Sequence, residues 1–568
     1  MDDELLGGWR ARVGLARVRL GWTAPALVAR RHAGGTSLAL QAPTDQLFVA
    51  TEINEWALCA TLVERAPDRS AGLEAGLQAA AIENAVAGQE LIPPVIDETA
   101  ALARFERLAA RERSPRLLAL LAAAAARALP EVLDDEILTL GVGQRGRDFS
   151  LVSLPSIAEV PWDTLGDVPT ALVTGSNGKT TTVRLLAACL NAAGYVVGYN
   201  CTDGVFVAGS ALDRGDYSGP AGARLVLRDR RVQAAVLETA RGGILRRGIA
   251  VTQARAAVVT NVSSDHFGEY GIDDLTGLAD AKLSVASVLL PDGLLVLNAD
   301  DALLRLSGDA LARRLGHCPP IGWFAAADDD PLLVAHRSRY GATCGVRDGR
   351  LVLTLAGASV DLGTIVAMPL TIDGSAAYNV ANLAAAALAA AALGVAPQTI
   401  ASVYADFGRA ADDNPGRLMR YRIGDVDVLV DYAHNPDGLR GLLGVARHLR
   451  RAGGRLGLLL GHAGNRQDVE LEALAAVAAA ARPDLVVVKE NEAHLRGRAA
   501  GEIPQILCAA LLRAGLPPSA LCVRMSEVEA ARQALDWARP GDLLVLPLHA
   551  AAARAAVLAM LGPDRPDG

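Results

Sequence analysis

The chain has 568 residues, of which 51% are hydrophobic and 4% aromatic, and its formal net charge is −8 at pH 7. This length allows several domains with large cores, and an acidic chain without a Lys/Arg-rich tail argues against nucleic acid as a partner. The N-terminus, Met-Asp-Asp-Glu, lacks the character of a secretory signal, and the longest apolar stretches, near 117–126 and 383–395, are too short to span a membrane. Seven scattered cysteines without a C-x-x-C pair are typical of reduced thiols. We therefore expect a cytoplasmic protein without a membrane or nucleic acid partner.

The first expected segment, residues 1–165, carries no recognisable catalytic motif. Its composition predicts a strand or short helix at 47–51 and at 56–63, a helix over 98–129, and a strand with a glycine turn over 137–154. Prolines at 155, 161 and 169 predict a linker into the next segment.

The second expected segment, residues 166–412, alternates short apolar strands with helical stretches. The strands are predicted at 171–174, 234–238, 256–262 and 294–298. This alternation is typical of a parallel sheet covered by helices, in which ligands bind at the carboxyl ends of the strands. Glu238, Asn261 and Asn298 follow apolar runs at such ends, which favours a nucleotide site over plain surface strands.

The third expected segment, residues 413–568, begins at the Pro/Gly break in 414–416. Strands are predicted at 426–430, 456–460, 485–488 and 543–546, with helices between them that include 470–481 and 527–537. The pattern indicates a second, smaller α/β domain of Rossmann-like type, and residues 562–568 are expected to be a frayed tail.

The most informative motif is T-G-S-N-G-K-T at 174–180, between a predicted strand and a predicted helix. Gly175 and Gly178 allow the backbone to approach anionic oxygens, and the helix N-terminus presents N–H groups and a positive dipole end. Lys179 adds a charge for the β- and γ-phosphates, and the hydroxyl of Thr180 or of the next threonine can bind Mg²⁺. These residues predict a phosphate-binding loop.

The motif departs from the common phosphate-binding loop, because Val173 stands where G-x-x-x-x-G-K-[ST] has glycine. A glycine turn ahead of a buried helix is the simpler alternative, but it gives no purpose to a lysine followed by three threonines. The short form T-G-x-N-G-K-T resembles the Mur ligases, the ATP-dependent amide ligases of peptidoglycan synthesis.

Further motifs extend this resemblance to the Mur-type half of cyanophycin synthetase. They are G-D-Y-S-G-P at 215–220, E-T-A-R-G-G-I-L-R at 238–246, T-N-V-S-S-D-H at 260–266, N-A-D-D at 298–301, N-P-G-R-L at 414–418, D-Y-A-H-N-P at 431–436 and L-R-G-R-A-A-G-E at 495–502. The resemblance runs from about 166 to 560 and implies a three-domain Mur-ligase-like α/β architecture. Its parts are an N-terminal α/β domain (1–165), a central ATPase domain with a P-loop parallel sheet (166–412) and a C-terminal Rossmann-like domain (413–568). The ATP-grasp module of cyanophycin synthetase is expected to be missing, with residues 99–155 resembling only its start.

The resemblance also implies roles for single residues. Nucleotide binding is expected from Gly175, Asn177, Gly178, Lys179, Thr180, Thr181, Asn298, Asn382, Arg417, Asp431 and His434. Catalysis is expected from Lys179, Glu238, His266 and Lys282, and Mg²⁺ binding from Thr180, Glu238 and His266. Substrate binding is expected from Asp203, Arg241, Arg246, Lys489 and Arg496.

Two of these residues have a plain structural alternative. A single histidine such as His266 often satisfies only local structure, and Lys282 on a helix is ordinarily solvated. In many Mur-type ligases a lysine at the position of Lys282 is carbamoylated by CO₂, which replaces an ammonium by an anion that helps a second Mg²⁺. Ser264 and Asn465 stand where the family often has acids.

The implied activity is ATP-dependent amide formation that releases ADP and phosphate. We expect an isopeptide ligase that joins an amino-acid amine to a carboxylate-bearing acceptor, a peptide or polymer containing aspartate as in cyanophycin. A separate ATP-grasp enzyme is an expected partner, and a homo-oligomer stays open. The alternatives are a Mur-type ligase for peptidoglycan, folate or polyglutamate substrates, and a catalytically silent nucleotide-binding subunit.

Overall fold

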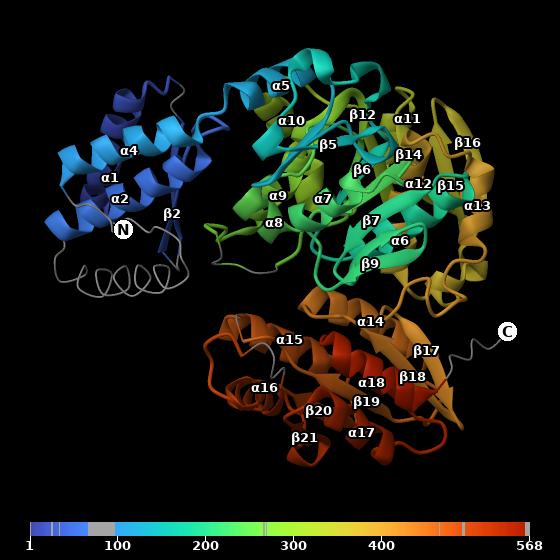
Figure 1. Cartoon of the computed structure of the whole chain (residues 1–568). Helices are drawn as coiled ribbons and strands as arrows, with labels where there is room; N and C mark the ends of the chain where they lie inside the picture. Colours follow the sequence, from blue (N-terminus) through green and yellow to red (C-terminus); the bar gives the residue numbers. More distant parts are fainter. Residues whose placement is uncertain are drawn as a thin grey trace. The chain divides into compact units, whose positions relative to one another are not determined.

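A computed structural model describes residues 2–23, 26–32, 35–65, 97–264, 267, 270–464, 466–490 and 495–562 (Figure 1). The chain forms two compact units, one of Met1–Gly141, Arg147–Gly166 and Phe267–Asp273, and one of Val142–Gly146, Asp167–His266 and Asp274–Gly568. The second unit contains nearly all of both expected Mur-like segments, while Phe267–Asp273 belongs to the first unit. The three domain boundaries stay a prediction. No helix in the described ranges combines the length and apolarity needed to cross a bilayer.

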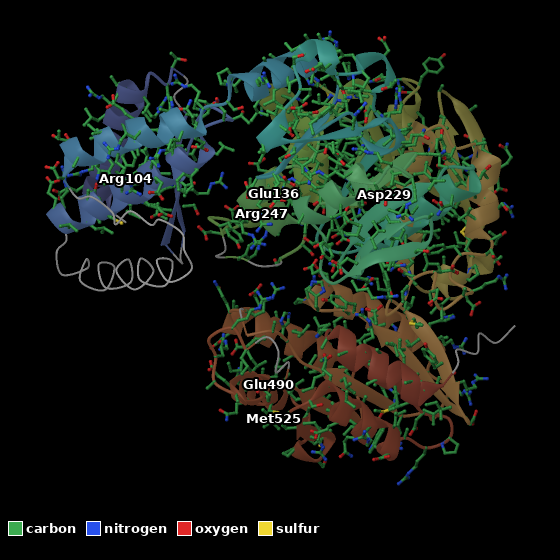
Figure 2. All side chains as sticks on the ribbon, in the orientation of Figure 1. Arg104, Glu136, Asp229, Arg247, Glu490 and Met525 are labelled. Carbon is green, nitrogen blue, oxygen red and sulfur yellow. The ribbon has the colours of Figure 1, made fainter. Side chains whose placement is uncertain are left out.

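Among its described residues, the first unit begins with three helices and a hairpin around an aromatic core. These are α1 (Asp3–Leu20), β1 (Leu27–His32), β2 (Gly35–Leu40), α2 (Leu47–Arg65) and α4 (Glu98–Glu112). Trp9, Trp56 and Phe105 are almost fully buried between the helices. Arg104 of α4, labelled in Figure 2, forms a partly buried ion pair with Glu52 of α2.

The same unit continues with α5 (Pro115–Ala125) and an antiparallel sheet of β3 (Glu131–Leu133), β4 (Ile137–Leu140) and β5 (Arg147–Ser150). The single helix predicted over 98–129 is wrong, because the chain breaks between α4 and α5. Ser114 caps α5 and Pro115 occupies its first turn, where a missing N–H costs nothing.

Within the described residues, eleven strands form the large sheet of the second unit. In spatial order they are β16 (Ala358–Thr364), β15 (Arg350–Leu355), β14 (Ala342–Arg347), β13 (Ile321–Ala327), β12 (Leu289–Asn298), β11 (Ala254–Val259), β6 (Thr170–Thr174), β10 (Ala234–Glu238), β7 (Val197–Cys201), β8 (Gly204–Val207) and β9 (Ser210–Arg214). The strands from β14 to β7 are parallel, and an antiparallel hairpin extends each edge. The predicted parallel sheet is therefore confirmed, and its register brings the ends of β6, β10, β11 and β12 to one edge.

Helices cover this sheet. They are α6 (Lys179–Ala192), α7 (Pro220–Arg228), α8 (Arg241–Arg247), α9 (Leu275–Leu283), α10 (Ala302–Leu315), α11 (Pro331–Arg337), α12 (Ala377–Ala392) and α13 (Pro397–Tyr404). After Asn382 the helix α12 consists only of alanine and leucine, and it is packed with α6 and the strands in one core cluster. The apolar stretch near 383–395 is thus explained by a buried helix.

Within the described residues, six further strands form a second sheet, ordered β17 (Met419–Ile423), β18 (Val426–Asp431), β22 (Leu543–Pro547), β19 (Leu456–Leu460), β20 (Leu485–Lys489) and β21 (Leu521–Arg524). All neighbours are parallel except β17 and β18. One core cluster joins this sheet to α14 (Pro436–Leu449), α15 (Asp468–Ala480) and α16 (Glu502–Arg513). Another joins it to α17 (Glu527–Trp537) and α18 (Ala551–Leu561). This is the predicted Rossmann-like arrangement.

Candidate active site

The phosphate-binding loop joins the buried strand β6 to the helix α6, as the sequence predicts. Gly175 and Gly178 have φ of 147° and 83°, in the region that favours glycine. A Cβ atom at Gly178 would lie 2.2 Å from Asn382 Oδ1, and one at Gly175 would lie 1.8 Å from Thr260 Oγ1. The loop therefore requires glycine at both positions, and the glycine N-cap leaves the first turn of α6 open to an anion.

Lys179 is folded over this loop, with Nζ 3.1 Å from the carbonyl oxygen of Gly175 and 3.0 Å from that of Ser176. It lines a cavity of about 420 Å³ in the second unit. The cavity is lined from the first sheet and its helices by residues that include Asn177, Thr180, Thr181, Glu238, Asn298 and Asn382, and from the later segment by Asn414, Arg417, Asp431, Tyr432 and His434.

The segment after β11 holds the loop in shape. The backbone N–H of Asn177 donates to Asn261 Oδ1 at 2.9 Å, and Thr260 Oγ1 donates to the carbonyl of Asn177 at 2.6 Å. Asn298 Nδ2 donates to the carbonyl of Thr260 at 3.0 Å. The polar residues that follow neighbouring strands are therefore connected to the phosphate-binding loop.

Glu238, at the end of β10, is 1% exposed and accepts two hydroxyl hydrogen bonds. Thr180 Oγ1 lies 2.7 Å from Glu238 Oε2, and Thr202 Oγ1 lies 3.1 Å from Oε1. Burial raises the pKa of Glu238, although Lys179, the Thr180 hydroxyl and a nearby arginine act in the opposite direction. A buried carboxylate beside a hydroxyl is the oxygen donor set that Mg²⁺ prefers.

The third segment contributes a carboxylate and an arginine to the same cavity. Asp431 Oδ2 accepts the N–H of Leu418 and Oδ1 accepts that of Ala433, both at 2.7 Å. Burial raises the pKa of Asp431 despite these bonds. Arg417 Nη2 donates to Thr180 Oγ1 at 3.2 Å, and its guanidinium lies 5.3 Å from the centre of the Tyr432 ring.

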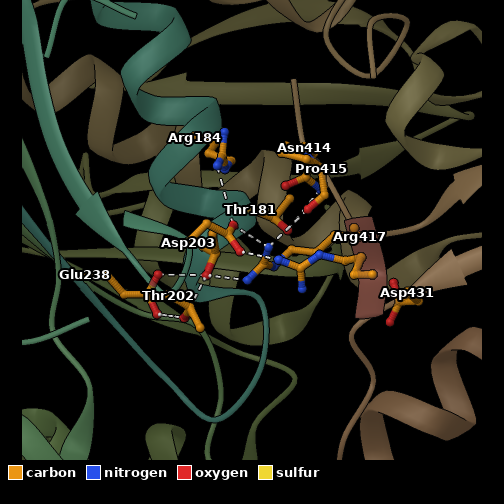
Figure 3. A network of polar contacts seen from close by, with 12 residues as sticks. Thr181, Arg184, Thr202, Asp203, Glu238, Asn414, Pro415, Arg417 and Asp431 are labelled. Carbon is orange, nitrogen blue, oxygen red and sulfur yellow. Dashed lines mark hydrogen bonds and ion pairs between the residues drawn. The ribbon is translucent and has the colours of Figure 1, made fainter. Parts of the chain in front are cut away.

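Arg417 also binds Asp203, which is at the centre of a network of polar contacts (Figure 3). Asp203 pairs with the guanidiniums of Arg417, Arg184 and Arg554 at 2.7, 3.4 and 3.0 Å. Burial alone would raise the pKa of Asp203, but the three guanidiniums hold it below its ordinary value. The carboxylate is therefore ionised at neutral pH.

Two family models match the chain over this region. Residues 173–317 match the Mur ligase middle domain, and residues 416–547 match the Mur ligase, glutamate ligase domain. The UDP-N-acetylmuramoyl-L-alanyl-D-glutamate--2,6-diaminopimelate ligase of Xanthomonas campestris pv. campestris is 31% identical over 385 residues, 66% of this chain and 70% of that protein. The chain belongs to the Mur ligase family.

Cyanophycin synthetase of Synechocystis sp. is similar at 35% identity over 386 residues, 68% of this chain and 43% of that protein. The chain thus spans less than half the length of this relative. A solved structure of Mycobacterium tuberculosis folylpolyglutamate synthase complexed with ADP has a TM-score of 0.52 and 18% identity, covering 70% of this chain and 91% of that one. The Mur-ligase-like architecture and the resemblance to the Mur-type half of cyanophycin synthetase are confirmed.

Several residues expected to act in this Mur ligase do not line the cavity. Arg241, at the start of α8, is buried, and Arg246 Nε donates to the carbonyl of Gly242 at 3.1 Å. Lys489, 1% exposed, pairs with Glu527 inside the core of the second sheet. Arg496 is exposed on a residue with φ of 47°. The substrate-binding role of these four residues stays a prediction. For Lys489, burial in the core argues against that role.

The structure gives no information on the expected catalytic residue His266 and shows that the expected catalytic residue Lys282 is buried. His266 lies outside the described residues. Lys282 is 3% exposed on α9, so the alternative of a solvated lysine on a helix surface is wrong.

Sequence reasoning missed Thr202, Tyr432 and Arg554 as members of the site. Thr202 immediately precedes Asp203, and Tyr432 lies inside the D-Y-A-H-N-P motif, so both were close to residues already singled out. Arg554 lies in an alanine-rich helix 351 residues from its partner Asp203, and no local pattern indicates that contact.

Proposed function

We propose that this Mur ligase is an ADP-forming acid–amino-acid ligase, which activates a carboxylate with ATP and joins it to an amine. The observation that carries the proposal is one cavity lined by Lys179, by the Thr180–Glu238 pair and by Arg417. Two relatives are named as a diaminopimelate ligase and a cyanophycin synthetase, which supports the same class of reaction.

The phosphate-binding loop fits the polyphosphate of ATP. The glycine-capped N-terminus of α6 offers backbone N–H groups, and Lys179 offers an ammonium close to the same turn. Asn298 and Asn382 line the cavity and offer amide groups to the nucleotide. Asp431 and His434 line it from the later segment, and we assign Asp431 to the ribose and His434 to the phosphates.

Thr180 and Glu238 would hold Mg²⁺, since a hydroxyl and a carboxylate oxygen are its preferred protein ligands. When bound, the ion neutralises charge that develops on the transferred phosphoryl group. His266 remains a proposed third contributor. Lys282 is 3% exposed and is not among the residues that line the cavity, and the resemblance to the Mur-type ligases is what supports a CO₂-derived carbamate on it.

The first step joins the acceptor carboxylate to the γ-phosphorus and expels ADP, which brings two anions together. Lys179 and Arg417 supply the compensating positive charge at the loop, and Arg417 is held beside Thr180 by its hydrogen bond. In the second step a neutral amine attacks the acyl carbon and phosphate leaves. An α-amine has a pKa of about 7.7–8.0, so a sizeable fraction is neutral without a strong base.

We further propose a cyanophycin-like substrate pair, an aspartate-containing acceptor and an amino acid joined by an isopeptide bond. A separate ATP-grasp enzyme would supply the acceptor backbone, and a homo-oligomer is compatible with this scheme. The similarity to the diaminopimelate ligase, which extends over 70% of that protein, favours peptidoglycan-type substrates as the second candidate. Folate and polyglutamate substrates belong to the same second class.

The test is phosphate release from Mg-ATP in the presence of aspartate-containing acceptors (free aspartate, short polyaspartate and β-Asp-Arg units) and a panel of amino acids. Mass spectrometry identifies the products, and Lys179→Met is the control without the loop cation. Release that requires both an acceptor and an amino acid, with a product joined through a side-chain carboxyl, supports the proposal. A second acceptor series contains a UDP-sugar peptide and a pterin. Release that requires one of these favours the second candidate, and no release with any acceptor of either series contradicts both.

A further inference from the structure

We propose that Asp203 and Arg554 are positioning residues, which together fix the guanidinium of Arg417 at the phosphate end of the cavity. The inference rests on the proposed function, and it assigns to these two residues a part in the same site.

Asp203 lies in the turn between β7 and β8, at the edge of the large sheet. Its two carboxylate oxygens bind different arginines of the third segment. Oδ2 accepts Arg417 Nη1 at 2.7 Å, and Oδ1 accepts Arg554 Nη2 at 3.0 Å. The side chains of Asp203, Arg417 and Arg554 are only 10–12% exposed, so water competes little for these bonds.

Arg417 gains a fixed geometry from this arrangement. One terminal nitrogen is bound to Asp203 and the other donates to Thr180 Oγ1 at 3.2 Å, beside the first turn of α6. Figure 3 shows the guanidinium of Arg417 beside Asp203. A planar guanidinium bound at both ends cannot rotate freely, so its charge is presented in one direction.

Arg554 reaches the same carboxylate from α18, and the chain leaves room for it. Gly416 has φ of 72°, and a Cβ atom there would lie 2.4 Å from Arg554 Cδ. The guanidiniums of Arg417 and Arg554 lie 5.3 and 5.7 Å from the centre of the Tyr432 ring. Arg554 binds Oδ1 and thereby orients the carboxylate so that Oδ2 faces Arg417, and without Arg554 the Asp203 side chain is free to turn.

A direct contact of Asp203 with substrate is the alternative expected from the sequence. Both of its oxygens are already bound to guanidiniums, and Asp203 is not among the residues that line the cavity. Action through Arg417 accounts for these facts.

The test compares Arg554→Met, Arg554→Lys, Asp203→Asn and the Asp203→Asn/Arg554→Met double variant. Arg513→Met is the control, because Arg513 forms an exposed ion pair with Glu472 on the surface of the same segment. For Arg554→Met we expect kcat for phosphate release to fall about tenfold or more, with KM for ATP within about threefold of the wild type. Arg554→Lys should recover part of kcat, the double variant should be no worse than Asp203→Asn alone, and Arg513→Met should behave as the wild type.

A normal kcat for Arg554→Met, or additive losses in the double variant, would overturn the inference. Hydrogen exchange of residues 414–418 gives a readout that needs no turnover, and we expect faster exchange there in Arg554→Met and in Arg554→Lys to a smaller extent. If the wild type releases no phosphate, the proposed function fails. Hydrogen exchange at residues 414–418 then still tests whether Arg554 holds Arg417 in place. Unchanged exchange at 414–418 in Arg554→Met contradicts the positioning role. Faster exchange in Arg554→Met, together with unchanged exchange in Arg513→Met, supports it.

Discussion

The hydroxyl of Thr180 donates to Glu238 Oε2 at 2.7 Å, inside a site where this carboxylate is 1% exposed. Glu238, which we propose as a Mg²⁺ ligand, is therefore a carboxylate whose ionised form is disfavoured by burial. Its raised pKa shows that burial outweighs the stabilising charges around it.

We expect Glu238→Gln to raise thermal stability and to abolish activity. The folded-state pKa is raised, so the native state binds more protons than the unfolded state above pH 4.5, and the cost of the carboxylate grows as pH rises. The melting temperature at pH 7 should increase by about 2 °C or more, with a smaller gain near the ordinary pKa of the group. Phosphate release should fall about 100-fold or more. Calorimetry in EDTA measures the first effect, and a melting temperature below that of the wild type would contradict the assignment.

We expect Gly178→Ala to weaken nucleotide binding at least about tenfold. Its new methyl group would meet Asn382 Oδ1 at 2.2 Å and displace a side chain that lines the cavity. Calorimetric titration with ATP measures the affinity.

Gly194→Ala is the matched control for that variant, at the other end of α6. Gly194 has φ of 92°, but a Cβ atom there has no described neighbour within 4 Å. Both variants should lose about 1 kcal/mol of unfolding free energy from the left-handed conformation. Equal loss of ATP affinity in both would show that backbone strain, and not the phosphate cradle, is responsible.

Most of the sheet framework follows from local sequence. Short apolar runs predicted β10 and β19 within their observed bounds, because buried parallel strands are continuously apolar. The helix α1 was not predicted, since its three glycines obscure the spacing of Leu5, Trp9 and Val13 along one face. The two pieces predicted at 47–51 and 56–63 are one helix, α2, stabilised by packing on α1.

Many residues that line the cavity were singled out by motifs, whereas the contact between Asp203 and Arg554 joins distant segments and has no local signal. Glu238 and Lys489 give the same local signal, one charged residue at the end of an apolar strand. Glu238 faces Thr180 and the cavity, whereas Lys489 is neutralised by Glu527 of a distant helix. Only the tertiary partner distinguishes the two, so the local pattern has no means of separating them.

We expect His549 to make stability depend on pH. Its pKa is lowered well below 6.5, mainly by burial and further by the charges of Lys489, His462 and His434. A hydrogen bond to the carbonyl of Ala433 acts in the opposite direction and raises the pKa. The native state thus binds fewer protons than the unfolded state below pH 6.5, and stability should fall with acidification by up to about 1.4 kcal/mol per pH unit. Urea unfolding between about pH 5 and pH 7.5 measures the slope.

His549→Gln is the control for that dependence, because an amide can still donate to Ala433 without titrating. The variant should lose the part of the slope due to this histidine. A slope identical to that of the wild type would show that His549 does not titrate in this window.

Replacing Lys489 separates a structural role from the substrate-binding role that the sequence suggested. Lys489→Met leaves Glu527 charged and buried, so we expect a loss of about 3–5 kcal/mol of unfolding free energy, measured in urea. The double variant Lys489→Met/Glu527→Gln removes both charges and keeps an acceptor for the N–H groups of His549 and Ala550, so it should recover a large part of the loss. If Lys489 acts only on stability, the recovered variant has the wild-type KM for the amino acid. A KM raised about tenfold in a stable double variant would instead support contact with substrate, because restored folding cannot explain it.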